Sequence, residues 1–142
     1  MRRCGKKGAS DMFAEHEAAF LASQRLARLA TVAANGQPDC DAVGFEFDGE
    51  WFYIGGVALP RSRKYKNIAG GNRLVSLIVD DLASVEPWRP CGIKLHGTAE
   101  IVTRDGRFGA KEYFAITPTV SWSWGLVGDD FYTMKKTVWP TR

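Results

Sequence analysis

The chain has 142 residues, 45% of them hydrophobic and 25% charged, which suits a single domain that folds without disulfide or metal staples. Its three cysteines (Cys4, Cys40 and Cys91) are an odd number without Cys-x-x-Cys spacing, which argues against a disulfide framework and a zinc site and favours the reducing cytoplasm. No run of 18 apolar residues occurs, which argues against a membrane span. The net charge of +3 is concentrated at Met1–Lys7 and Arg61–Lys66, which favours a local anion site over a broad nucleic-acid-binding surface.

The N-terminal part of the chain is expected to contain an extension, a helix and a strand. Residues 1–10 are expected to form a disordered extension that precedes a single domain over residues 11–142. The apolar residues of Asp11–Ser23 recur with helical spacing, and Asp11 is a candidate N-cap for that helix. Leu26–Ala33 is a short apolar segment with small and β-branched residues, which predicts a first strand.

Two turn signals then delimit the next strands. Asn35-Gly36 is the strongest kind of short hairpin signal, and Asp48-Gly49 marks a second turn. Between these turns, Ala42–Phe47 alternates with its odd-numbered apolar residues on one face, which predicts a second strand. Trp51–Gly56, rich in aromatic residues, is expected to form the third.

The second half of the chain predicts further strands. Leu74–Val79 is an almost continuous apolar run, which predicts a strand buried on both faces. Ile93–Val102 alternates cleanly between apolar and polar residues, which predicts a strand with one buried face. The remaining expected elements are a polar loop, a short helix and two strands, in the order Asp80–Pro90, Lys111–Ile116, Val120–Gly125 and Tyr132–Trp139. Six to seven antiparallel strands with a few short helices predict a mainly β fold, a closed or partly closed barrel.

A cluster of cations follows the third strand. Arg61, Ser62, Arg63 and Lys64 come at the start of an expected short helix, for which Ser62 is a plausible N-cap. Cations are disfavoured at a helix N-terminus, where the backbone dipole is positive, unless an anion neutralises them. Phosphate is the usual anion at such a place, so these residues predict a phosphate-binding turn. The alternative is a solvated basic turn without a ligand.

Short motifs follow one another in a distinctive order between Phe13 and Trp139. They are Arg28-Leu29-Ala30-Thr31-Val32 with Gly36-Gln37-Pro38, Val43-Gly44-Phe45-Glu46-Phe47-Asp48-Gly49, Tyr53-Ile54-Gly55-Gly56, Ser62-Arg63-Lys64-Tyr65-Lys66-Asn67, Asn72-Arg73-Leu74-Val75-Ser76 and Lys94-Leu95-His96-Gly97-Thr98-Ala99-Glu100. Each motif is weak alone. In this order and spacing, the chain resembles the pyridoxamine 5′-phosphate oxidase-like split-barrel superfamily, and within it the actinobacterial branch that uses the deazaflavin coenzyme F420.

This resemblance implies a split β-barrel, like that of FMN-binding proteins, which forms a homodimer with the cofactor in a groove between the subunits. It implies that Ser62, Arg63 and Lys64 hold the cofactor's phosphate group, with Arg61 and Asn67 beside them. It also implies that the cofactor ring lies against two strand segments, formed by Val43, Gly44 and Phe45 and by Tyr53, Ile54 and Gly55.

The activity that the resemblance implies is hydride transfer between coenzyme F420 and an unidentified small organic substrate. An FMN-dependent oxidoreductase of the same fold is one alternative, and a non-catalytic protein that binds a flavin, deazaflavin or tetrapyrrole is another. The chain has Lys135–Pro140 near its C-terminus instead of the Arg-rich segment of the oxidase proper, so oxidation of vitamin B6 is not expected.

Four side chains are candidates for contact with a substrate. His96 is the candidate general acid, because an imidazole titrates near neutrality; the alternative is a histidine satisfied by its neighbours on a barrel strand. Trp88, Trp122 and Trp124 are candidates for an apolar wall against a flat ligand; the alternative is packing in the core or a dimer interface. A small-molecule substrate and a second copy of the chain are the expected partners, with no metal, nucleic acid or membrane.

Overall fold

The computed structural model describes residues 12–128 and 133–141. Within these ranges the chain forms two α-helices, α1 (Glu15–Ser23) and α2 (Arg63–Ala69), and a 3-10 helix, η2 (Leu59–Arg61). Neither described helix has the length and apolar character that crossing a membrane would require. The strands of the described ranges are β1 (Leu26–Val32), β2 (Pro38–Gly44), β3 (Glu46–Phe47), β4 (Phe52–Ile54), β5 (Leu74–Ser84), β6 (Arg89–Gly106), β7 (Gly109–Trp124) and β8 (Lys135–Val138). The extension expected at residues 1–10 lies outside the described residues.

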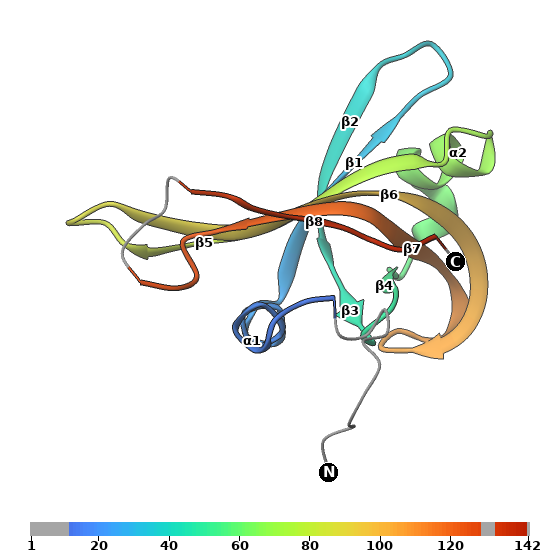
Figure 1. The fold of residues 1–142 in the computed structure, drawn as a ribbon. Helices are drawn as coiled ribbons and strands as arrows, with labels where there is room; N and C mark the ends of the chain where they lie inside the picture. Colours follow the sequence, from blue (N-terminus) through green and yellow to red (C-terminus); the bar gives the residue numbers. More distant parts are fainter. Residues whose placement is uncertain (1–11, 129–132, 142) are drawn as a thin grey trace.

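All strands pair antiparallel in one sheet, in the order β2-β1-β5-β6-β7-β4-β3, with β8 added to β7. The sheet curves so that β3 and β4 come round to the side of β2, as Figure 1 shows. The prediction of a mainly β split barrel is therefore confirmed. The strand count differs from the expected six to seven because Ala42–Phe47 is divided at Phe45. Its first part pairs with β1 and its last part pairs with β4.

The barrel interior is filled by alternate residues of the strands, since successive side chains of a strand point to opposite faces. Leu29, Leu77, Leu95 and Ile116 are among the residues that are at most 1% exposed. One end of this core is aromatic: the ring of Phe13 lies 5.0 Å from that of Trp139 and 5.5 Å from that of Phe47 in edge-on contacts. These contacts attach the chain before α1 and the chain after β8 to the same core.

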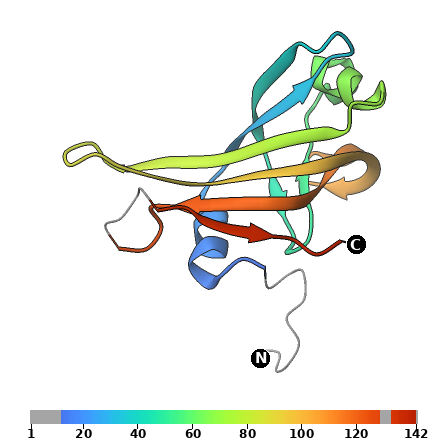
Figure 2. The same cartoon turned by 45° about the horizontal axis from the view of Figure 1, so that its top comes forward.

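The two helices lie at opposite ends of the barrel (Figures 1 and 2). Helix α1 begins at Glu15, and its N-cap position is Ala14, whose backbone N–H donates to the carboxylate of Glu17 at 2.8 Å. Asp11, the expected N-cap, lies outside the described residues, and the carboxylate of Glu17 satisfies the N–H at the cap position instead. Helix α2 covers the other end, where it packs against β1.

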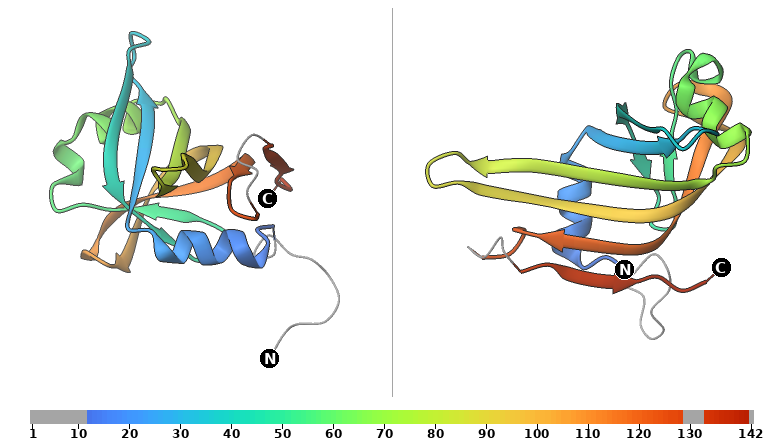
Figure 3. Two further views of the ribbon diagram at one scale, coloured as in Figure 1. Left: turned by 90° about the vertical axis from the view of Figure 1, so that its left-hand side faces the viewer. Right: turned by 90° about the horizontal axis from the view of Figure 1, so that it is seen from above.

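Strand β5 differs from its prediction in both length and burial. The chain remains extended through Ser84 and returns from Arg89, so most of the loop expected at Asp80–Pro90 is a paired strand in a long hairpin arm. This arm and its neighbours lie side by side in the right-hand view of Figure 3. The expected burial of Leu74–Val79 on both faces is wrong, because Leu74 is 74% exposed and only alternate residues enter the core.

Strand β7 replaces the short helix that was expected at Lys111–Ile116, and that prediction is wrong. This segment pairs with β6 on one side and, from Phe114 to Ile116, with β4 on the other. It is buried on both faces: Phe114 and Ile116 fill the core, while Tyr113 lies under the β6–β7 turn. Because the segment is buried on both faces, its sequence lacks the alternation of apolar and polar residues that is typical of a strand. The sequence pattern therefore predicted a helix.

Candidate functional site

The basic turn has the local structure that the sequence predicts. The hydroxyl of Ser62 accepts a hydrogen bond from the backbone N–H of Tyr65 at 3.2 Å, which makes Ser62 the N-cap of α2. The same hydroxyl donates to the carbonyl of Leu59 at 2.6 Å, which joins η2 to α2. Both hydrogen bonds are local, so Ser62 shapes the turn on which its cationic neighbours stand.

The cations of this turn fall into two groups. Lys64 has a side chain only 17% exposed, and its Nζ lies 3.3 Å from a carboxylate oxygen of Asp41 on β2. Arg61 and Arg63 are exposed, and neither side chain makes an ion pair or hydrogen bond within the described residues. The protein therefore neutralises one cation with its own carboxylate and leaves two guanidinium groups available to an anion from solution.

Asn67 has a structural role at this turn. It is 5% exposed, and its amide donates to the hydroxyl of Thr31 on β1 at 2.9 Å. This buried hydrogen bond fixes α2 against the barrel, and so it holds the basic turn in place. The amide of Asn67 is committed to Thr31 in this arrangement.

The strand residues expected to contact the cofactor ring divide between the two faces of the sheet. Val43, Phe45 and Ile54 are at most 6% exposed and belong to the core, so they present only backbone atoms to a ligand. Gly44 and Tyr53 are partly exposed and alternate with them, so they belong to the opposite face. Gly55 cannot carry a side chain, since an added Cβ would lie 2.3 Å from Cε2 of Tyr113.

A charged and aromatic cluster covers Tyr53, and sequence analysis missed it. The guanidinium of Arg104 lies 3.8 Å from the ring centroid of Tyr53 and donates to Glu46 Oε2 at 3.0 Å. It also lies 5.4 Å from the ring centroid of Tyr113. Arg104 comes from β6 and Glu46 from β3, far apart in the sequence, and the strand order β6-β7-β4-β3 brings them to the same part of the sheet.

Burial and hydrogen bonding perturb two titratable groups beside this cluster. Burial by itself raises the pKa of Asp48, but hydrogen bonds from the backbone N–H groups of Trp51 and Glu50 and from Tyr53 outweigh it and leave the pKa lowered. Burial, with the nearby Asp48 carboxylate, raises the pKa of Tyr53. Tyr53 therefore remains a neutral hydrogen-bond donor that links β4 to the turn at Asp48.

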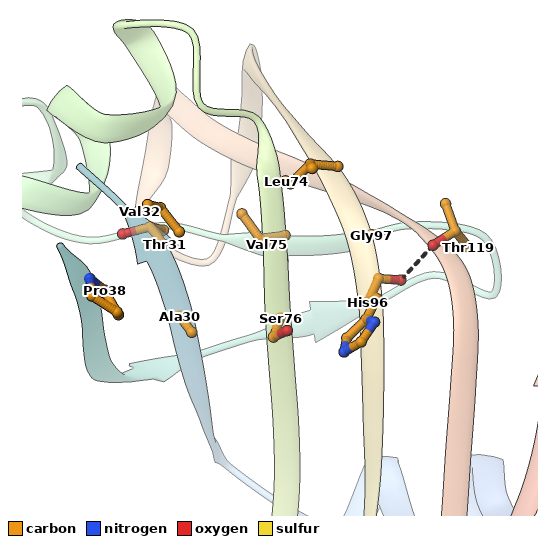
Figure 4. Close-up of a pocket in the computed structure, with 10 residues that line it drawn as sticks. All are labelled: Ala30, Thr31, Val32, Pro38, Leu74, Val75, Ser76, His96, Gly97 and Thr119. Carbon is orange, nitrogen blue, oxygen red and sulfur yellow. Dashed lines mark hydrogen bonds between the residues drawn. The ribbon is translucent and has the colours of Figure 1, made fainter. Parts of the chain in front are cut away.

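A groove of about 420 Å³ lies on the outer face of the sheet, across five strands. Apolar residues of β1, β2 and β5 make much of its surface, and His96 and Thr119 stand on its other side, as Figure 4 shows. Ala30, Ser76 and His96 form one row across three strands, since each is the register partner of the next. The lining residues are Ala30, Thr31, Val32, Pro38, Leu74, Val75, Ser76, His96, Gly97 and Thr119.

A β-bulge shapes the wall of this groove. His96 pairs with Val120 but Gly97 pairs with Pro118, so Thr119 is the extra residue of β7. The hydroxyl of Thr119 donates to the backbone carbonyl of His96 at 3.1 Å. Gly97 is required here, because an added Cβ would lie 2.4 Å from the carbonyl oxygen of Thr117. The bulge thus sets where the imidazole stands relative to the groove.

The three candidate tryptophans do not form one wall. The ring of Trp122 lies 4.9 Å from the ring of His96 in an edge-on contact, and Nζ of Lys94 lies 4.8 Å from the Trp122 ring centroid. Trp124 lies two residues further along β7, opposite Gly92. Trp88 is 58% exposed beside the turn of the β5–β6 arm. Of the three, Trp122 is the one with a ring contact to a residue that lines the groove.

A second groove, of about 450 Å³, lies between α1 and β3, and Arg107 contributes to it. Within the described residues, no three metal-ligating side chains come together. Cys91 is buried, and burial raises the pKa of its thiol, an effect that the Asp81 and Asp80 carboxylates increase. Its thiol therefore stays protonated and unreactive.

Comparison with known proteins identifies the family of this chain. Residues 13–123 match the family described as pyridoxamine 5′-phosphate oxidase. A protein of Streptomyces rimosus subsp. rimosus, described as a 5a,11a-dehydrotetracycline/5a,11a-dehydrooxytetracycline reductase, is 37% identical over 123 residues. That alignment covers 82% of this chain and 86% of the Streptomyces protein.

Solved structures share the fold at lower identity. A haem-binding protein of Mycobacterium smegmatis has a TM-score of 0.68 at 16% identity, over 95% of this chain and 60% of that one. A structure described as an F420 reductase has a TM-score of 0.53 at 22% identity, over 69% of this chain and 89% of that one. Because the same barrel occurs in proteins with these different ligands, the fold alone does not identify a cofactor.

Proposed function

The chain belongs to the pyridoxamine 5′-phosphate oxidase family, and from that premise we propose that it is a coenzyme F420-dependent oxidoreductase. The observation that carries the proposal is the pair of exposed guanidinium groups, Arg61 and Arg63, which have no anionic partner within the described residues. Their position on a turn fixed by Ser62 and Asn67 suits a phosphate-bearing ligand. The similarity to a Streptomyces reductase supports the oxidoreductase class.

The donor set of the turn fits the phosphodiester of the deazaflavin. Arg61 and Arg63 supply guanidinium groups, and Lys64 supplies an ammonium whose charge is shared with Asp41. Helix α2 has seven residues, so the side-chain charges carry more of this argument than the helix dipole. Gly44 and Tyr53 would lie against the ring from the outer face of β2 and β4, with Arg104 and Glu46 holding Tyr53 in place.

Reduced coenzyme F420 supplies a hydride when it is bound. The chain's own residues then have to hold the acceptor, exclude water and deliver a proton to the neighbouring carbon. His96 stands on the wall of the outer groove and is the residue proposed to supply this proton. By analogy with the substrate in the name of the Streptomyces protein, we take the acceptor to be a conjugated carbon–carbon double bond in a polycyclic compound.

We further propose that two copies of the chain associate through the outer face of the sheet. This face carries exposed apolar side chains on β1, β5 and β8: Val32 is 37%, Leu74 74% and Val138 69% exposed. Apolar side chains gathered on one surface of a protein favour association with a partner. A second copy on this face would convert the outer groove into a cleft between subunits. Light scattering should give twice the chain mass, and Leu74→Glu should lower it.

Titration of coenzyme F420 against the purified protein tests the proposed cofactor. We expect the protein to quench F420 fluorescence on binding and to oxidise the reduced cofactor when a dehydrotetracycline acceptor is added. FMN retained through purification, with no affinity for F420, would assign the alternative FMN-dependent activity. Binding of flavin or haem without oxidation of any reduced cofactor would assign a carrier and contradict the proposal.

A further inference from the structure

The outer face of the sheet carries two adjacent transverse rows of residues with different chemistry. One row runs through Ala30, Ser76, His96, Val120 and Val138, which pair in register across five strands. It is mostly apolar, and its first three members line the groove shown in Figure 4. Because the side chains of this row project from a sheet, they form a broad apolar surface that suits a ligand with a flat apolar body.

The neighbouring row is cationic and aromatic. It runs through Arg28, Ile78, Lys94, Trp122 and Lys136 by the same register. The two rows are two residues apart along each strand, which is about 7 Å. The groove therefore has an apolar surface with cations on one side of it, at a distance comparable to the width of a small ring system.

Lys94 is the cation of this row that lies on the same strand as His96, two residues away from it. It is half-buried, and its Nζ is held over the Trp122 ring at 4.8 Å. It makes no ion pair with a carboxylate within the described residues. Arg28, by contrast, lies 3.8 Å from Asp80. A fixed, uncompensated ammonium beside an apolar groove favours a ligand with an anionic oxygen.

From these observations we infer that Lys94, His96 and Trp122 form a recognition site for an anionic oxygen of the acceptor. The ligand class is a flat conjugated compound with an enolate, phenolate or carboxylate group. Its apolar body lies in the groove along Val32 and Leu74, and its anionic oxygen receives a hydrogen bond from Lys94, with the Trp122 ring beside it and His96 left to supply the proton. This inference rests on the proposed function only in naming the ligand as the hydride acceptor.

The cofactor ring is a second possible source of a flat anion, and the experiment has to separate the two. Without any cofactor present, the binding of 2-naphthoate is compared with that of its neutral methyl ester by calorimetry. We expect the wild-type protein to prefer the carboxylate. In Lys94→Met this preference should fall by about tenfold, the scale of one charge-assisted hydrogen bond, while the affinity for the ester stays unchanged.

Matched variants keep the test decisive. Lys111→Met removes another half-buried lysine, at the far end of the β6–β7 hairpin, and should leave the preference intact. Lys94→Arg should retain it, because a guanidinium also donates to an anionic oxygen. The unfolding midpoint of each variant shows whether it is folded. An unchanged preference in folded Lys94→Met overturns the inference.

Measuring F420 binding by the same variants distinguishes an error in the proposed anion site from an error in the proposed function. If Lys94→Met weakens F420 binding and leaves naphthoate binding unchanged, the site belongs to the cofactor and the inference is wrong. If the protein does not bind F420 but shows a Lys94-dependent preference for naphthoate, the proposed cofactor is wrong and the anion site stands. With both bound, Lys94→Met should raise the KM of an enolate acceptor with the F420 affinity unchanged.

Discussion

Two regions of this protein place cations on the surface, and they use them in opposite ways. At the α1 end, Lys135 of β8 donates to the carboxylate of Glu17 at 2.8 Å, and Ser123 donates to the same carboxylate at 2.6 Å. At the α2 end, Arg61 and Arg63 have no such partner within the described residues. The first region holds elements of the fold together, while the second leaves charge for a ligand.

The difference lies in the carboxylates rather than in the cations. Glu17 is 1% exposed, so its charge requires internal partners, and Lys135, half of whose side chain is exposed, serves it from the surface. The comparison teaches that a cluster of cations indicates a ligand only where the protein supplies no buried acid.

The largest effect is expected from removing the acid of the structural region. Glu17→Ala leaves the hydroxyl of Ser123 without its partner and releases β8 from α1, so the free energy of unfolding should fall by about 3 kcal/mol. Urea denaturation measures it. Glu100→Ala is the control, because its ion pair with Arg73 is exposed and is expected to contribute less than about 0.5 kcal/mol. Equal losses in the two variants would show that Glu17 has no special role.

The region of Arg61 and Arg63, where we propose that the cofactor binds, should respond through affinity instead of stability. Arg63→Ala should weaken F420 binding by about 1.5 to 3 kcal/mol, the scale of a charge-assisted hydrogen bond, with an unchanged unfolding midpoint. Fluorescence titration gives the affinity. Lys66→Ala removes an exposed charge from the same helix and serves as the control. An equal loss in both variants would indicate general electrostatic attraction and not a phosphate site at this turn.

Lys64 is intermediate between the paired Lys135 and the exposed Arg61 and Arg63, because it pairs with Asp41 but belongs to the basic turn. Variants of Lys64 therefore test the comparison. Because its charge is shared with Asp41, Lys64→Ala should weaken F420 binding by about 1 kcal/mol, less than Arg63→Ala does. Asp41→Asn frees the ammonium and should strengthen binding by about threefold. The same titration measures both. Weaker binding by Asp41→Asn would show that the pair acts by positioning Lys64.

The smallest effect is expected from pH. Burial alone would raise the pKa of Glu17, but hydrogen bonds from Lys135, Ser123 and the backbone of Ala14 outweigh it, so the pKa lies below its ordinary value of 4.5. The unfolded chain therefore binds a proton more readily, and stability present above pH 4.5 is lost as the pH falls through the lowered pKa. Melting temperatures between pH 6 and pH 3 should fall less steeply in Glu17→Gln than in the wild type. Identical slopes would contradict this assignment.

Several parts of the fold follow from local sequence patterns. Ile93–Val102 alternates and lies within β6, the segment predicted as a strand at Leu26–Ala33 forms β1, and Ser62 caps α2 as its position predicts. These predictions succeeded because side-chain period and capping depend on residues that are neighbours in the chain. The prediction of a helix at Lys111–Ile116 failed because contacts with β4 and with the β6–β7 turn bury both faces of that segment.

The candidate site shows the same division. The basic turn was predictable, because its cations are consecutive in the sequence. The pairing of Lys64 with Asp41 and the position of Arg104 over Tyr53 were not, because each joins residues from different strands or helices. The role of Asn67 was also hidden, since its partner Thr31 lies on β1.

By itself, the sequence determined the strand at Ile93–Val102, where the hairpin at Asn35-Gly36 turns, and where positive charge accumulates. Tertiary structure decided which of those charges are paired among the residues that the structure describes, where Asp41 of β2 neutralises Lys64 and no carboxylate pairs with Arg61 or Arg63. It also decided which residues share the outer face with His96, since strand register aligns Lys94 with Trp122. Local sequence patterns predict whether a residue is exposed, whereas the residues that it contacts depend on the order and register of the strands.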